Sequence, residues 1–249
     1  MALGIALANP DPLLFLLQIS DSALPIGSYS HSWGLETAVQ AGHLTTLTQV
    51  QAYLEGILHL SLLPQEAQAC RLGFHARRDP QRWLMANNYL TACRWAEEPH
   101  RASLLLGKRL AAWGEKHWGI PMPPGAEQHH SPVFGWVCAH AEVAEGACLS
   151  AYLWSTLQAL TTAAVKLVPL GQSQGQTLLC ALQPQIVRGV EELQQQPLTQ
   201  LTEFPAFPEG SQPCQSPENL EIPQIWSFAP LQERDCHQHQ YLYSRLFQS

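Results

Sequence analysis

Five polar side chains that could do chemistry lie within one short stretch: Asp21, Ser22, Ser28, Ser30 and His31. A hydroxyl, an imidazole and a carboxylate are the groups that a hydrolase uses for nucleophilic catalysis. A serine nucleophile usually sits in a G-x-S-x-G turn between a strand and a helix, and this stretch has neither that turn nor a strand pattern before it. A connection between two helices is therefore the simpler interpretation. An all-α hydrolase-like enzyme that uses the Asp21–His31 loop stays an alternative.

Eleven histidines raise the question of a metal site. Imidazole and thiolate ligands suit Ni²⁺, Zn²⁺ or Cu²⁺. The pair His129-His130 and the run from Cys236 to His239 are the richest segments, but no further ligand stands at metal-binding spacing near either. His237 and His239 are weak candidates, which leaves a metal chaperone with a histidine-rich tail as a second alternative. The seven cysteines form no C-x-x-C pair, and we expect no metal and no other cofactor.

The end of the chain carries the better candidates for binding a partner protein, namely Tyr241, Tyr243, Ser244, Arg245, Leu246 and Phe247. Tyrosine and arginine are enriched among residues that dominate binding energies at protein interfaces. A chain end is usually poorly ordered unless it docks on something. From the residues alone, docking on a partner and docking on the chain's own core are both open.

Composition narrows the class of protein. Charged residues make up 13% of the 249 residues, against about 25% in a typical soluble domain. Either a large core or surface hidden against other proteins accounts for this. The net charge of −7 and the lack of a basic stripe argue against nucleic-acid binding. The chain has neither an apolar run of about 20 residues for a membrane helix nor a signal peptide, so we expect a cytoplasmic protein.

The elements that position these residues are helical. Apolar residues recur at spacings of three and four, and no useful run alternates with period two. The pattern predicts an all-α, single-domain bundle of roughly eight to ten helices. We expect Pro64 to end one helix and Pro184 to break another or begin a new one. The expected order is a disordered leader (1–12), a helical domain (13–196), a Pro-rich linker (197–230) and a C-terminal segment (231–249).

Three separated stretches resemble, in the same order, the family of the urease accessory protein UreF. They read SDSALPIGSYSHSWGLE at 20–36, KLVPLGQ at 166–172 with Gly175-Gln176 after it, and YSRLF at 243–247. The motif positions to which the resemblance gives a structural role are Ser22, Pro25, Gly27, Ser30, His31, Gly34, Glu36, Lys166, Pro169, Gly171 and Gln172.

The resemblance implies a non-enzymatic scaffold of nickel delivery to urease. Such proteins dimerise, bind the accessory protein UreD (also called UreH), and help to recruit the GTPase UreG to the urease apoprotein. It also places the contact with UreD/UreH at residues 243–247. Two positions depart from the family pattern, because Lys166 stands where arginine is expected and Gln240 where glutamate is usual. Lysine and arginine are not interchangeable in a bidentate contact, so these departures bear on the partner contacts.

Overall fold

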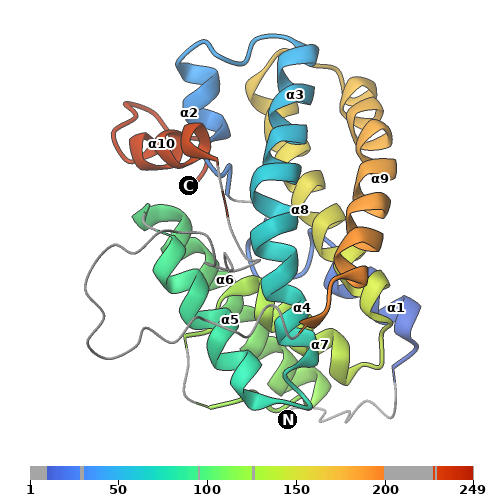
Figure 1. The fold of residues 1–249 in the computed structure, drawn as a ribbon. Helices are drawn as coiled ribbons and strands as arrows, with labels where there is room; N and C mark the ends of the chain where they lie inside the picture. The colour runs from blue at the N-terminus through green and yellow to red at the C-terminus, as the bar shows by residue number, and fades with distance from the viewer. Residues whose placement is uncertain are drawn as a thin grey trace, which may run out of the picture.

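The computed structural model shows an all-helical protein (Figure 1), and the described residues contain ten α-helices and no strand. This confirms the predicted fold class and helix number. The described residues are 10–28, 31–94, 96–124, 127–198, 227 and 229–248. The expected leader (1–12) and linker (197–230) lie largely outside them, as do Ser30 and residue 249.

The α-helices are α1 (Pro12–Ile19), α2 (Leu35–Gln40), α3 (Leu47–Ile57), α4 (Gln68–His75), α5 (Pro80–Cys93), α6 (Glu97–Trp113), α7 (His130–His140), α8 (Glu145–Leu167), α9 (Gln172–Gln195) and α10 (Pro230–His239). Two π-helical stretches extend them, η2 (Leu58–Ala67) and η3 (Gly114–Trp118). None of the helices in the described part of the chain is long and apolar enough to cross a membrane.

The two internal prolines do not behave as expected. Pro64 lies inside η2, which joins α3 to α4 in one uninterrupted helical rod, so the prediction that it ends a helix is wrong. In an α-helix the proline ring clashes with the carbonyl four residues earlier. The wider π-helical turn, bonded from residue i to i+5, displaces that carbonyl and lets the rod continue. Pro184 likewise lies within α9, which runs on to Gln195.

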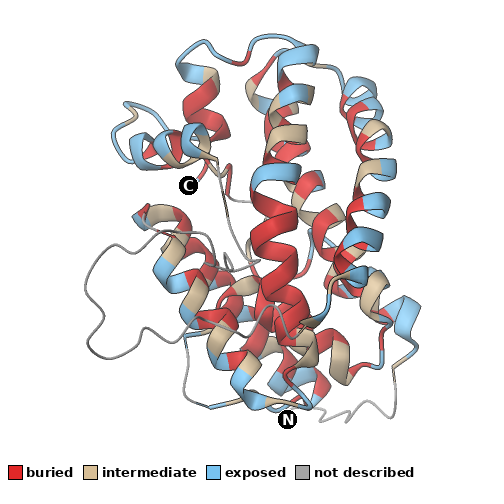
Figure 2. Cartoon of the chain, viewed as in Figure 1, coloured by how far each residue is buried: buried red, intermediate tan, exposed pale blue. Residues whose placement is uncertain are grey.

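The core lies where the rod meets α7 and α8, and buried residues concentrate there (Figure 2). Two glycines let α4 and α7 approach until their backbones touch. A Cβ atom on Gly73 would lie 2.2 Å from the Pro132 carbonyl oxygen, and one on Gly135 would lie 2.0 Å from the Cys70 carbonyl oxygen. No side chain larger than hydrogen fits at either place, so this packing depends on the two glycines.

A buried ion pair ties the core elements together. The carboxylate of Glu66 on η2 pairs with the guanidinium of Arg94, and both side chains are 6% exposed. The Ser131 hydroxyl of α7 donates to the same carboxylate at 2.8 Å, and the Tyr152 hydroxyl of α8 donates to it at 3.1 Å. A buried charge is tolerated when it is paired and its remaining hydrogen-bonding capacity is used. These contacts therefore fix η2, α7 and α8 relative to Arg94.

The glycine contacts give a matched test of the helix packing. We expect Gly135→Ala to lower the free energy of unfolding by about 1–3 kcal/mol or more, because the new methyl group collides with the backbone of α4. Gly56→Ala, in α3, meets nothing within 4 Å and should raise it by up to about 1 kcal/mol through helix propensity. Urea denaturation measures both, and equal effects would contradict the packing described.

Candidate functional site

The C-terminal end of the chain folds back onto the N-terminal motif. Figure 1 shows α10 lying beside α2, far from it in sequence. At Gly34, which precedes α2, φ is +86°, and a Cβ atom there would lie 3.1 Å from both the Cys236 nitrogen and the Gln232 carbonyl oxygen. Glycine is needed for the backbone angle and for the close approach of α10. This gives one motif residue a physical role.

Glu36 on α2 is the acceptor that holds the last residues of the chain. Its side chain is 2% exposed. One carboxylate oxygen accepts from the Leu246 N–H at 2.6 Å, and the other accepts from the Phe247 N–H at 3.1 Å. The second oxygen also lies 3.0 Å from Nε2 of His239. Three groups from the C-terminal segment therefore converge on one buried carboxylate.

His239 connects this carboxylate to a second one. Its Nδ1 lies 2.7 Å from a carboxylate oxygen of Glu98 on α6, and its side chain is fully buried. The other oxygen of Glu98 accepts from the Arg245 guanidinium at 3.1 Å. The ring of His239 thus links the carboxylate on α2 to the carboxylate on α6, and Arg245 joins the second carboxylate from the tail.

Phe247 brings in the third sequence motif. Its ring is buried, and Nζ of Lys166, in the last turn of α8, lies 5.8 Å from the ring centroid. This is the distance range of a cation–π contact. The N–H of Gly171 donates to the side chain of Gln174 at 2.8 Å and so shapes the turn into α9. Residues from all three motifs therefore meet at the end of the chain.

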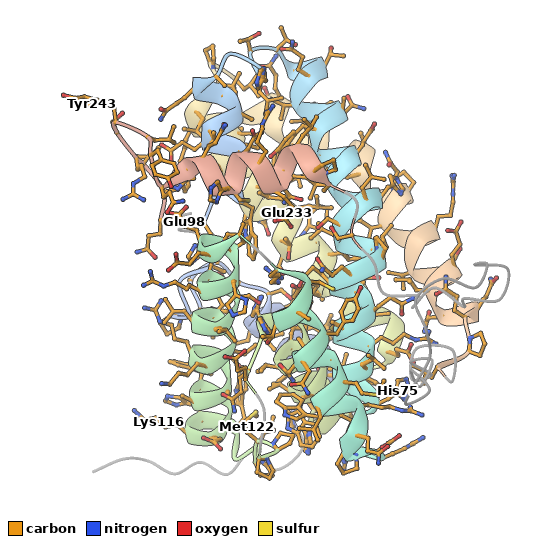
Figure 3. The ribbon with its side chains drawn as sticks, turned by 60° about the vertical axis from the view of Figure 1, so that its left-hand side comes forward. His75, Glu98, Lys116, Met122, Glu233 and Tyr243 are labelled. Carbon is orange, nitrogen blue, oxygen red and sulfur yellow. The ribbon has the colours of Figure 1, made fainter. Side chains whose placement is uncertain are left out.

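The six predicted partner-binding residues divide into two groups. Phe247 is buried, Arg245 donates to Glu98 at 3.1 Å, and the Ser244 carbonyl accepts from Gln40 Nε2 at 3.0 Å. Tyr241, Tyr243 and Leu246 remain 73%, 105% and 64% exposed. Figure 3 shows Tyr243 pointing away from the helices, whereas Glu98 lies beneath α10. The tail docks on its own core and at the same time presents three large side chains to solvent.

The N-terminal loop lines a cavity of about 310 Å³, and Ser22 forms part of the cavity wall. Asp21 accepts from the Ala23 N–H at 2.8 Å, which is a turn contact. Pro25 leads to Gly27, whose φ is +87°. His31 is buried, and burial together with Arg109 lowers its pKa to about 4. Ser30, the serine that precedes it in the motif, lies outside the described residues.

The tail histidines do not converge on a metal site in the described residues. Both ring nitrogens of His239 face carboxylates, and His237 is an exposed residue whose ring lies 6.0 Å from that of Tyr241. Sequence reasoning missed Glu98, which lies in the first turn of α6 and outside the three motifs. It lies 141 residues from His239 and 147 residues from Arg245 in the sequence. No local sequence pattern predicts contacts between residues so far apart.

Comparison with known proteins adds independent evidence. A family model described as UreF matches residues 44–183. Urease accessory protein UreF of Nostoc sp. (strain PCC 7120) is 36% identical over 186 residues, covering 72% of this chain and 81% of the relative. The protein of the same name from Bacillus sp. (strain TB-90) is 30% identical over 196 residues, covering 74% and 86%. That from Azoarcus sp. (strain BH72) is 34% identical over 203 residues, covering 78% and 87%.

The role of Glu36 is tested by its removal. Glu36→Ala deletes the acceptor for two backbone N–H groups and a charged partner of His239, so we expect hydrogen exchange at Leu246 and Phe247 to accelerate at least tenfold. Gln40→Ala removes a single exposed contact to the tail and should leave these amides protected. Amide exchange followed by mass spectrometry measures both variants. Unchanged protection in Glu36→Ala would contradict the anchoring role.

The low pKa of His31 predicts a pH dependence of stability. The folded state keeps this imidazole neutral down to about pH 4, whereas the unfolded chain protonates it below about pH 6.5. Its contribution is therefore fully present above pH 6.5 and is lost at about 1.4 kcal/mol per pH unit as the pH falls toward 4. His31→Gln should show a shallower loss of unfolding free energy between pH 6.5 and 4.5. His43→Gln, at an exposed position, should follow the wild type, and parallel curves for all three proteins would count against this assignment.

Proposed function

This chain belongs to the UreF family, the non-catalytic accessory proteins of urease maturation, and we propose that its C-terminal segment is the surface that binds UreD/UreH. On this proposal the chain is a scaffold. It bridges UreD/UreH and the GTPase UreG to the urease apoprotein while nickel is inserted, and it does so as a homodimer. Membership of the family supports a role in the assembly of urease. The geometry of the tail supports the proposal that UreD/UreH binds there.

The observation that carries the proposal is the exposure of large side chains on an anchored chain end. Tyr243 is fully exposed and Tyr241 nearly so, while residues on either side of Tyr243 are tied to Glu36 and Glu98. Tyrosine contributes strongly to protein interfaces. An anchored segment also loses less conformational entropy on binding than a free one. The anchored residues of the tail thus hold its exposed side chains in place for a partner.

Each docked residue has a supporting part in this proposal. Arg245 and Phe247 hold the tail through Glu98 and Lys166, so their loss would act on binding through disorder of the tail. Tyr241, Tyr243 and Leu246 would act by direct contact. The two groups are separable by experiment, because only the first should alter the protection of backbone amides in the free protein.

The test is binding of co-expressed UreD/UreH to the full chain. We expect the double substitution of Tyr241 and Tyr243 by Ala to weaken the complex at least tenfold while thermal melting stays unchanged, because both side chains are in solvent. Truncation before Tyr241 should abolish binding. Val187→Ala, which removes a 53% exposed apolar side chain from α9, is the matched control and should bind like the wild type.

The outcomes are distinct. Wild-type affinity in the tyrosine double variant would move the interface to the helical body and overturn the proposal for the tail. Equal loss in the Val187 variant would indicate a general effect on the surface and would also contradict it. Loss of binding in the tyrosine variant at an unchanged melting temperature, together with loss on truncation and none in the Val187 variant, supports the tail as the contact.

A further inference from the structure

Three potential metal ligands converge away from the tail, where the loop before α7 crosses α5 and α6. They are His100 in the first turns of α6, and Glu127 and His129 at the end of the loop. One ligand atom of each lies within 4.8 Å of those of the other two. We propose that these three residues bind one divalent transition-metal ion of the type of Zn²⁺ or Ni²⁺.

The donor set suits such an ion. Two imidazoles and one carboxylate are typical ligands of zinc and nickel, and three protein ligands leave a position open for water or for a ligand from another molecule. In a tetrahedral site the ligand atoms lie roughly 3.4 Å apart, given metal–ligand bonds of about 2.1 Å. Closure from a spacing of at most 4.8 Å needs the ligand atoms to approach by no more than about 1.4 Å. The exposed Glu127 and the half-buried His100 can make that movement.

His129 is the fixed ligand of the three. Its side chain is fully buried, and its backbone N–H donates to the Asn87 side chain at 2.9 Å. The preceding residue rests directly on α6, because a Cβ atom on Gly107 would lie 1.9 Å from the Gln128 carbonyl oxygen. On the ring, Nδ1 lies 3.0 Å from the Ser103 hydroxyl oxygen. A metal needs the tautomer in which Nδ1–H donates to that oxygen, because Nε2 then carries a lone pair.

A bridging hydroxyl already holds two of the ligand atoms together. The Thr91 hydroxyl on α5 donates to a carboxylate oxygen of Glu127 at 2.7 Å and lies 3.0 Å from Nε2 of His129. On metal binding, a bond to the ion replaces the contact between Thr91 and Nε2, while Thr91 continues to orient Glu127. A second partner of this kind is usual for metal ligands. His100 completes the group, with its ring edge-on to that of His129 at 5.4 Å between centroids.

The surrounding charge permits a cation at this place. Arg94 is the positively charged group that acts on His129, and its charge is balanced in the buried pair with Glu66. Glu127 supplies a negative charge that is not paired with a cation among the described residues. A bound ion would connect the loop, through Glu127 and His129, to His100 on α6. Metal binding should therefore raise the stability of the folded protein.

The experiment titrates Zn²⁺, and separately Ni²⁺, into the full metal-free chain by calorimetry, with the visible spectrum of Co²⁺ as a report of its ligands. We expect one tight site per chain and an upward shift of the melting temperature on binding. His100→Ala and Glu127→Gln should each weaken this site at least tenfold and reduce the Co²⁺ absorption. Both positions are outside the close-packed core, and circular dichroism checks that each variant folds.

His43→Ala and His237→Ala are the matched controls, since each removes an exposed histidine elsewhere. They should leave the tight site intact. Absence of a one-to-one site in the wild type would overturn the proposal, as would unchanged affinity in both His100→Ala and Glu127→Gln. Loss of the site in His237→Ala would assign metal binding to the tail and would overturn it equally.

Discussion

The buried carboxylate of Glu36 determines where the chain ends. A carboxylate that is withdrawn from water costs several kcal/mol unless donors replace its hydration. Here the donors are the backbone N–H groups of Leu246 and Phe247 and the ring of His239, all from the C-terminal segment. The ordered position of the tail and the burial of Glu36 therefore depend on each other. Tyr243 lies between His239 and these anchored residues and remains exposed.

A second buried carboxylate, that of Glu66, holds the helices of the core together. Glu66 gathers Arg94, Ser131 and Tyr152 from separate elements, and the Arg94 guanidinium lies 5.2 Å from the ring of Trp33, close to α2. The tail is joined to the helical body through His239 and Glu98. Hydrogen bonds and ion pairs therefore connect the tail to the helices, so the end of the chain is part of the fold. This organisation suits the proposed role of a scaffold, whose binding surface must keep its position relative to the rest of the molecule.

Much of the fold could be predicted because its causes are local. The spacing of apolar residues indicated the helices. Gly42 lies just past the end of α2 with φ of +77°, which is a common position for glycine. Pro64 shows the limit of such rules. Its effect on an α-helix is local and was expected, but the rod continues through a π-helical turn that buries Leu62 and Leu63 in the core. Tertiary packing outweighed the local preference.

The sequence by itself determined the helical class, the family and the residues of the three motifs, since periodicity and motif residues are properties of short stretches. Only the tertiary structure decided which of those residues meet. Glu36 and Phe247 are 211 positions apart, and His100 joins Glu127 and His129 only because the loop crosses α6 at Gly107. The physical reason is that a side chain's partners depend on how helices pack. That packing is a sum over the whole core, so no single segment encodes it.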